Sequence, residues 1–488
     1  MSKKLIRETL IATLTVLVLT GAVAFAAAAD TSVKTPSNYY TFQPPAKGAT
    51  YVDAAFGTTI KRVSSALQTT NNADGGLLQW VLSEYSTPSL FNRDNSRFLL
   101  QHGSYYAIYD GTGTYLKDAP FDVNAATEPR WSRKDVNVFY YKRGNALKSY
   151  NLATNAIATV RTFSEYGAIS GNGESDICFD GDHVVLVGDN REVFVYTIST
   201  NQKGNVLSTA GNGFDSVYIS ADDQVTVTWL APGTNRFQGI ELFDKNMSFL
   251  RQVAHAGGHM DMGRDVNGDA VLVWTNAADA TPVCQNGIVK IRLADGKQTC
   301  VVTGIDWNLA VHVSANDQGY AVVSTYAPSD PNPASFWPLY TNEILRVKLD
   351  GSSIERLAHH RSRPLNGYNY MSKASINRDG TRVLFSSNFG LQAQLGYPTE
   401  YSDVYLINLA GASPTATPTT RPTATATATP APTATPSTTR VEETSGTVTF
   451  DASWYPNANA AHSAGASKMA MVDAIVTVPF SGTGIVWR

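Results

Sequence analysis

Short runs of β-branched and aromatic residues alternate with Gly, Asn and Asp between about residues 51 and 409. Almost none of these runs shows apolar residues spaced three or four apart, which is the spacing of an amphipathic helix. Polar turn residues separate the runs at short intervals, as they do between the strands of antiparallel sheets. The pattern therefore predicts an all-β region.

One unit recurs seven times in this region: a short strand, a polar turn, an apolar strand and an outer hairpin. It reads FNRDNSRFLL near the start and INRDGTRVLFSS near the end, with turns 41 to 63 positions apart. A four-stranded propeller blade takes roughly 40 to 50 residues. We therefore predict an all-β, seven-bladed β-propeller over residues 51–412, because the alternative of stacked β-sandwiches does not account for seven similar units. The turn residues are Asp94, Asp135, Asp180, Asp222, Asn267, Asn316 and Asp379.

Two further signals fit a closed ring. Asp295-Gly296 and Asp350-Gly351 lie between alternating strands, where such pairs form hairpin turns. The strand expected within Phe56–Ser65 has no blade of its own, and we expect it to complete the last blade and remove the open edges.

The N-terminus reads as an export signal. Lys3, Lys4 and Arg7 precede an apolar stretch that ends before Asp30. This order predicts a signal peptide over residues 1–29, a secreted mature protein and an N-terminal extension over residues 30–50. An uncleaved membrane anchor is the alternative, but Ala and Thr make the stretch weakly apolar. We expect no membrane span in the mature protein.

The composition changes after the repeats. Residues 413–440 are nearly all Thr, Pro and Ala, which predicts an extended, disordered linker. Strand-like sequence resumes in residues 441–488, which we interpret as part of a truncated β-sandwich similar to carbohydrate-binding modules.

Charge and cysteine content narrow the choice of partners. The 38 basic and 41 acidic residues give a formal net charge of -3, so the chain lacks the positive field that nucleic-acid binding needs. Cys284 and Cys300 flank a predicted hairpin and are expected to form a disulfide, whereas Cys178 lies in an apolar run and reads as a core residue. We expect a monomer.

The inner strands of a propeller surround a central channel, and residues preceding each polar turn are expected to ring one mouth of it. His259 and Asp261 are two apart on a predicted strand, so they face the same side and would share a proton or a ligand. A structural hydrogen-bonded pair is the alternative. The expected ring comprises Ser86, Pro88, Arg130, Glu174, Asp176, Asp215, His259, Asp261, His312, Tyr370 and Lys373.

The connection from His359 to Ser375 forms a second candidate site. It combines His, Arg, Tyr and Lys, which suits an acidic or hydroxyl-rich ligand, although an exposed basic loop would have the same composition. Trp337, in a neighbouring loop, is expected to wall the same mouth. The candidate binding residues here are His360, Arg361, Arg363, Lys373 and Trp337.

The segments YVDAAFGTTIKRV, GHMDMGRDVNG, VHVSANDQG and INRDGTRVLFSSNFG carry a family resemblance. They resemble the TolB-type propellers, and among these the oligogalacturonate lyase-like propellers of secreted bacterial proteins. That resemblance implies a divalent metal such as manganese or calcium, held by mouth histidines, with another histidine as base. His259 and His312 fall at such positions, but Met371 and Lys373 stand where those lyases have a histidine pair, so the cofactor stays open.

The leading functional hypothesis is a lyase that cleaves an extracellular uronate polysaccharide by β-elimination. The catalytic candidates are His259 or His312 as base, Tyr370 as acid, and Arg363 or Lys373 to neutralise the carboxylate. The binding candidates are Arg130, Asp261, His360, Arg361, Lys373 and Trp337. The alternative is a non-catalytic propeller that binds a cell-surface glycan or a protein. A glycosidase using Glu174 and Asp215 is a more distant reading.

Overall fold

The computed structural model describes residues 30–172, 175–276, 281–327, 330–363 and 367–409, and four short strands between residues 449 and 477. The predicted signal peptide, the linker and most of the predicted sandwich lie outside the described residues. The chain divides into two compact units, residues 1–415 and 416–488. In the described part of the chain, no helix has the length and apolar character needed to cross a membrane.

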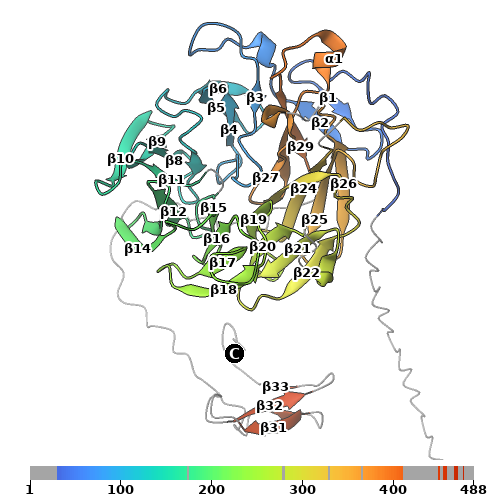
Figure 1. Cartoon of the computed structure of the whole chain (residues 1–488). Helices are drawn as coiled ribbons and strands as arrows, with labels where there is room; N and C mark the ends of the chain where they lie inside the picture. Colours follow the sequence, from blue (N-terminus) through green and yellow to red (C-terminus); the bar gives the residue numbers. More distant parts are fainter. Residues whose placement is uncertain are drawn as a thin grey trace, which may run out of the picture. The chain divides into compact units, whose positions relative to one another are not determined.

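The first unit is a seven-bladed propeller, as the sequence predicts. Figure 1 shows seven sheets around a central axis, coloured in chain order from blue to orange. Blades 1 to 3 are β3 (Val81–Leu82), β4 (Arg97–His102), β5 (Tyr105–Asp110) and β6 (Tyr115–Asp118); β7 (Arg130–Trp131), β8 (Val138–Arg143), β9 (Ala146–Asn151) and β10 (Ala156–Thr162); and β11 (Ile169–Ser170), β12 (His183–Gly188), β13 (Glu192–Thr197) and β14 (Gln202–Ser208).

Blades 4 to 6 repeat the same antiparallel order. They are β15 (Phe214–Ile219), β16 (Val225–Trp229), β17 (Ile240–Phe243) and β18 (Phe249–Ala254); β19 (Met260–Arg264), β20 (Ala270–Thr275), β21 (Ile288–Arg292) and β22 (Gln298–Val302); and β23 (Ala310–Ala315), β24 (Tyr320–Tyr326), β25 (Glu343–Lys348) and β26 (Ile354–His359).

The seventh blade contains strands from both ends of the unit. Its sheet runs β1 (Thr50–Val52), β2 (Thr59–Arg62), β29 (Asp403–Asn408), β28 (Arg382–Ser387) and β27 (Ser375–Ile376). Strand β2 pairs antiparallel with β29, and Figure 1 shows these blue and orange strands side by side. The expected ring closure by the early strand is therefore confirmed. The described short helices are η1 (Ala66–Gln68), η2 (Pro282–Cys284), η3 (Tyr368–Tyr370) and α1 (Leu391–Leu395).

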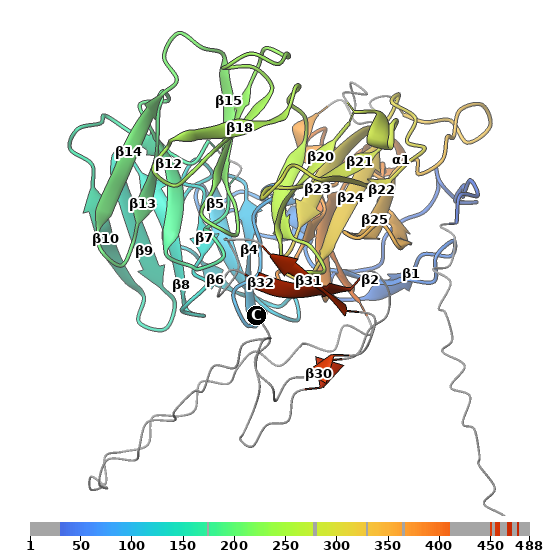
Figure 2. The ribbon, with the colours of Figure 1, turned by 90° about the horizontal axis from the view of Figure 1, so that it is seen from below.

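The core lies between neighbouring blades. Every residue of β20 is buried, whereas β10, the outer strand of blade 2, is mostly exposed. A middle strand is covered on both faces by the adjacent sheets, so its sequence is a continuous apolar run rather than an alternation. Figure 2 shows blades 2 and 3 side by side in this way.

The repeated polar turns connect the two innermost strands of each blade. Asp94, Asp135 and Asp379 each accept a hydrogen bond from the backbone N–H two residues later, at 3.0, 2.8 and 3.0 Å. Asp and Asn recur there because their side chains satisfy the backbone of a tight turn. Gly296 and Gly351, each with φ of 77°, occupy the left-handed positions of the predicted hairpins.

The cysteine predictions are confirmed. Cys284 and Cys300 form a disulfide within blade 5, and Cys178 is a free, buried residue packed between blades 3 and 4. The second unit contains β30 (Thr449–Phe450) paired with β33 (Val476–Thr477), and β31 (Trp454–Ala458) paired with β32 (Ala466–Ala470). The sandwich therefore stays a prediction.

Asp403 fastens the closure of the ring. Its buried carboxylate lies 2.7 Å from Arg62 Nη2 and accepts hydrogen bonds from the Ser64 hydroxyl at 2.7 Å and the Ala66 N–H at 2.8 Å. The Tyr401 hydroxyl also donates to it. One side chain thus joins the segment that follows β2 to the start of β29.

Replacing Asp403 with Asn should lower the free energy of unfolding by about 3 kcal/mol, because Arg62 would lose its buried charge partner. The matched control is Asp295→Asn, whose carboxylate pairs with Arg292 at an exposed hairpin. That change should leave the free energy of unfolding almost unchanged, because solvent screens an exposed ion pair. Denaturant unfolding of both variants measures the difference, and equal losses would show that Asp403 does not hold the ring closed.

Candidate functional site

Two histidines converge at one mouth of the channel. His259 immediately precedes β19 and His312 lies in β23, so adjacent blades supply them. Their ring centroids are 4.6 Å apart with an interplanar angle of 31°. His312 is 2% exposed and its Nδ1 has no hydrogen-bond partner among the described residues. The structure therefore brings together the two residues predicted as candidate bases.

Tyrosines surround the histidine pair. Tyr326 stacks on His312 at 5.2 Å and Tyr85 meets it edge-on at 5.4 Å. Tyr85 is parallel to Tyr368, with centroids 6.5 Å apart, and Tyr368 is 51% exposed. Aromatic faces of this kind pack well against the apolar faces of sugar rings. Tyr85 and Tyr326 were not predicted from the sequence, because single tyrosines on loops and strands carry no pattern.

The pKa of both imidazoles is lowered, so both resist protonation. Burial is the main cause that holds the pKa of His312 well below its ordinary value, and His259 and Lys373 add charge repulsion. Burial also lowers the pKa of His259, against the effects of a hydrogen bond to the Val311 backbone and of nearby Asp215. His259 keeps accessible surface at the mouth although neighbouring atoms crowd its ring. Each histidine is therefore neutral at neutral pH and able to accept a proton.

Lys373 lies in the same mouth. Its side chain is fully buried, and its Nζ has no hydrogen-bond partner among the described residues but lies 3.6 Å from the centroid of the Tyr368 ring. Burial lowers its pKa to about 7, an effect that the negative charge of Glu84 opposes. This ammonium is a candidate receptor for an anionic group.

Arg130 lies at the mouth but has a partner. Its Nη1 is 3.0 Å from both carboxylate oxygens of Glu84, and its Nε donates to the Ser175 carbonyl at 2.8 Å. The side chain is 3% exposed. Arg130 therefore neutralises Glu84, a residue that was not predicted from the sequence.

Asp261 lies deeper in the channel and bonds to the backbone. Its carboxylate accepts hydrogen bonds from the N–H groups of Met262 and Ala315, both at 2.7 Å, and burial raises its pKa well above the ordinary value. Blades 5 and 6 approach closely here: a Cβ on Gly263 would lie 2.9 Å from the Ala315 Cβ. The contacts match the structural alternative for Asp261.

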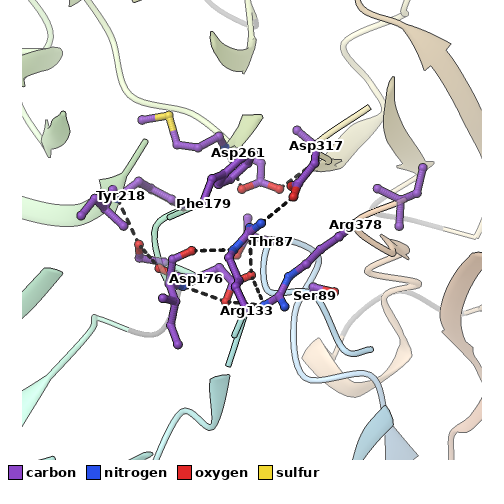
Figure 3. A pocket seen from close by; sticks show the side chains of 15 residues that line it. Thr87, Ser89, Arg133, Asp176, Phe179, Tyr218, Asp261, Asp317 and Arg378 are labelled. Carbon is purple, nitrogen blue, oxygen red and sulfur yellow. Dashed lines mark hydrogen bonds and ion pairs between the residues drawn. The ribbon is translucent and has the colours of Figure 1, made fainter. Parts of the chain in front are cut away.

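A charged network crosses the channel below the mouth, as Figure 3 shows. Arg133 lies 2.6 Å from Asp317 and 3.6 Å from Asp176, and Arg378 lies 3.1 Å from the same Asp176. Four blades contribute to it, and it lines a cavity together with Asp261 and Phe179. The network was not predicted, although Arg133 lies two positions before the turn residue Asp135 and Arg378 lies one position before Asp379.

The second predicted site is occupied by the N-terminal extension. The Arg361 guanidinium donates to the Asn38 side chain at 3.0 Å, Arg363 donates to the Tyr39 carbonyl, and the Trp337 indole donates to the Lys34 carbonyl at 2.9 Å. All three side chains are buried or nearly so. They anchor residues that precede the first blade.

The remaining candidate residues lie in different environments. His360 is fully buried and bonded to the Thr325 carbonyl at 2.9 Å, and burial lowers its pKa to about 4. Asp215 is exposed, near His259. Glu174 and the side chain of Tyr370 lie outside the described residues, so their predicted roles stay predictions.

The mouth does not fit a divalent metal. Among the described residues, three or more His, Cys, Asp or Glu side chains converge in one place, at Cys178, Asp180 and Asp223 between blades 3 and 4. The mouth instead offers two imidazoles beside the Lys373 ammonium, and manganese or calcium would need further oxygen or nitrogen ligands. These side chains do not form the metal site that the family resemblance implies.

Comparison with known proteins agrees with the fold. No family model and no curated protein sequence matches the chain. Among solved structures, it resembles an oligogalacturonate lyase in complex with manganese, with 14% identity and a TM-score of 0.50, over 75% of this chain and 98% of that one. It also resembles an oligogalacturonate lyase from Vibrio parahaemolyticus, with 13% identity and a TM-score of 0.51, over 74% of this chain and 98% of that one. The chain is thus a seven-bladed propeller with the architecture of the oligogalacturonate lyases.

Proposed function

We propose that the protein is secreted and cleaves a uronate-containing polysaccharide by β-elimination at the mouth that holds His259 and His312. The observation that carries this proposal is the close approach of two neutral imidazoles, one of them with an unpartnered ring nitrogen among the described residues. Most buried polar side-chain atoms in folded proteins have a hydrogen-bond partner, so a buried ring nitrogen without one is a candidate for contact with a ligand. The named activity of the structural neighbours supports the same choice of substrate.

His259 is the base in this proposal. His259 is neutral because burial lowers its pKa, and it keeps accessible surface at the mouth, so it can accept a proton there. His312 packs against the ring of His259 and holds it in place. Burial disfavours the cationic form of His259, so the ring stays neutral until it takes the proton of the substrate.

The aromatic wall binds the sugar chain. Tyr368 is about half exposed and lies parallel to Tyr85, and Tyr85 meets His312 edge-on. This wall equally supports the alternative, a propeller that binds the glycan without cleaving it. Binding with no unsaturated product on any uronate polymer would select that alternative.

His259→Asn should lower kcat/KM by at least about 100-fold, because a general base contributes roughly 10²- to 10⁴-fold. Ultraviolet absorbance of the unsaturated product, measured over a panel of uronate polymers, follows the reaction. The matched control is His183→Asn, which changes a histidine beside the polar turn of blade 3 and should leave the rate unchanged. Full activity in His259→Asn would contradict its role as base.

The rate should tolerate mild acidity. The pKa of His259 is lowered by burial, so the base stays unprotonated as the pH falls to its ordinary pKa of about 6.5, and activity is lost below that value. The acid limb of kcat/KM against pH reports this group in the free enzyme. A limb above pH 7 would point to a different base.

Tyr368→Ala should weaken binding of a uronate oligosaccharide about tenfold, since an aromatic contact contributes roughly 0.5 to 1.5 kcal/mol. Tyr368→Phe keeps the aromatic face and should bind as the unaltered protein does. Isothermal titration calorimetry compares the three proteins. Equal affinity of the Ala variant would remove Tyr368 from the binding surface.

A further inference from the structure

Lys373 is a buried cation whose charge has no carboxylate partner in contact among the described residues. Its side chain has no exposed area, and its Nζ makes no hydrogen bond to them. Its backbone φ of 39° lies in the left-handed region, which a residue with a side chain adopts at a cost. Burying an unpaired ammonium also costs free energy. The fold thus holds this group in place against two unfavourable effects.

The other cations considered for this role are already engaged. Arg130 pairs with Glu84, and Arg361 and Arg363 bond to the N-terminal extension. Arg363 was the alternative carboxylate neutraliser predicted from the sequence, and its guanidinium lies against the Tyr39 and Tyr40 rings. Lys373 therefore offers unused donors at the mouth.

The Tyr368 ring covers the ammonium. It lies over Nζ at 3.6 Å, and about half of the tyrosine surface is exposed. A ring face stabilises a cation more weakly than a carboxylate does, so a carboxylate can replace it. The tyrosine ring thus contacts the ammonium in the free protein, and an anionic ligand would take its place.

We propose that Lys373 binds the carboxylate of the reacting uronate and that the reaction at this mouth needs no divalent metal. This inference rests on the proposed lyase function. The described residues of the mouth supply no set of metal ligands, and a metal ion would be repelled by the ammonium. One structural neighbour is in complex with manganese, but the described residues at the mouth of this chain do not supply a set of ligands for that ion.

The reaction balances without a metal. Lys373 stabilises the negative charge that builds up on the carboxylate as His259 removes the proton from the adjacent carbon. The electron pair of that C–H bond forms the new carbon–carbon double bond, and the bond from the next carbon to the glycosidic oxygen breaks. The leaving oxygen takes a proton from water, and the resulting hydroxide accepts the proton that His259 holds.

A binding experiment tests the role of Lys373 apart from catalysis. Lys373→Met should bind a galacturonate trimer about 30-fold more weakly, the loss expected for one charge-assisted hydrogen bond, and should bind its methyl ester as the unaltered protein does. Calorimetry measures both ligands. Equal loss for acid and ester would indicate damage to the fold of the mouth, and no loss for either would show that Lys373 does not meet the carboxylate.

A metal experiment tests the second half. Activity should stay within twofold after exhaustive chelation and on addition of manganese or calcium, and elemental analysis should find no bound metal in the active protein. Activity lost on chelation and restored by manganese would overturn the inference while leaving the lyase function intact. Failure to cleave any uronate polymer would instead refute the lyase function. The titration with the trimer would still test whether Lys373 binds the carboxylate.

A pH profile separates a charge role from a packing role. The titratable groups around Lys373 are Glu84, His312 and Tyr368. Because the pKa of Lys373 is about 7, kcat/KM should fall as the pH rises above that value and the ammonium is lost. Lys373→Arg keeps the charge and should move this alkaline limb upward by at least one pH unit. An unchanged limb in the Arg variant would show that the charge of Lys373 is not required.

Discussion

Closure of the ring is the constraint on which the rest of the structure depends. Each sheet buries both faces against its neighbours, so an open ring would expose one apolar face at each end. Strand β2 beside β29 and the carboxylate of Asp403 remove these ends. The same closure places blade 1 next to blade 7, and so brings Tyr85 to Tyr368 and His312. The mouth exists as one site because the first and last blades meet.

The channel changes in character along its length. At the mouth, His312 Nδ1 and Lys373 Nζ have no hydrogen-bond partner among the described residues, and His259 is accessible. Deeper, Asp261 is satisfied by backbone amides, and beyond it arginines and aspartates neutralise one another across the axis. Each of these buried charges has an opposite partner, so none is left uncompensated in the interior. The unpartnered Lys373 ammonium and His312 nitrogen at the mouth are the groups that the proposed ligand would contact.

The sequence was sufficient for the architecture because a blade repeats. Seven turns with Asp or Asn at similar spacing predict seven sheets, and the unassigned strand near residue 60 predicts the closure. The residues that meet at the mouth were harder to predict, because their contacts depend on the strand register of every blade. His259 and His312 were found because both precede a recognisable turn. Arg361, Arg363 and Trp337 were misleading for a physical reason. They bind residues 34–39 of the same chain, a contact between segments about 300 positions apart that no local pattern predicts.

Closure by β2 and β29 also orders events during synthesis. Arg62 and Asp403 are separated by 341 positions, so the strand made first waits for the partner made last. Until then β2 carries an unpaired edge, and the loop to be closed spans nearly the whole propeller. A chain that ends just before residue 403 would contain all the strands of blades 1 to 6 but would lack β29, so the ring could not close. Such fragments would expose apolar sheet faces and an unpaired strand edge, and they would therefore tend to aggregate. The unit needs its full length to form a closed propeller.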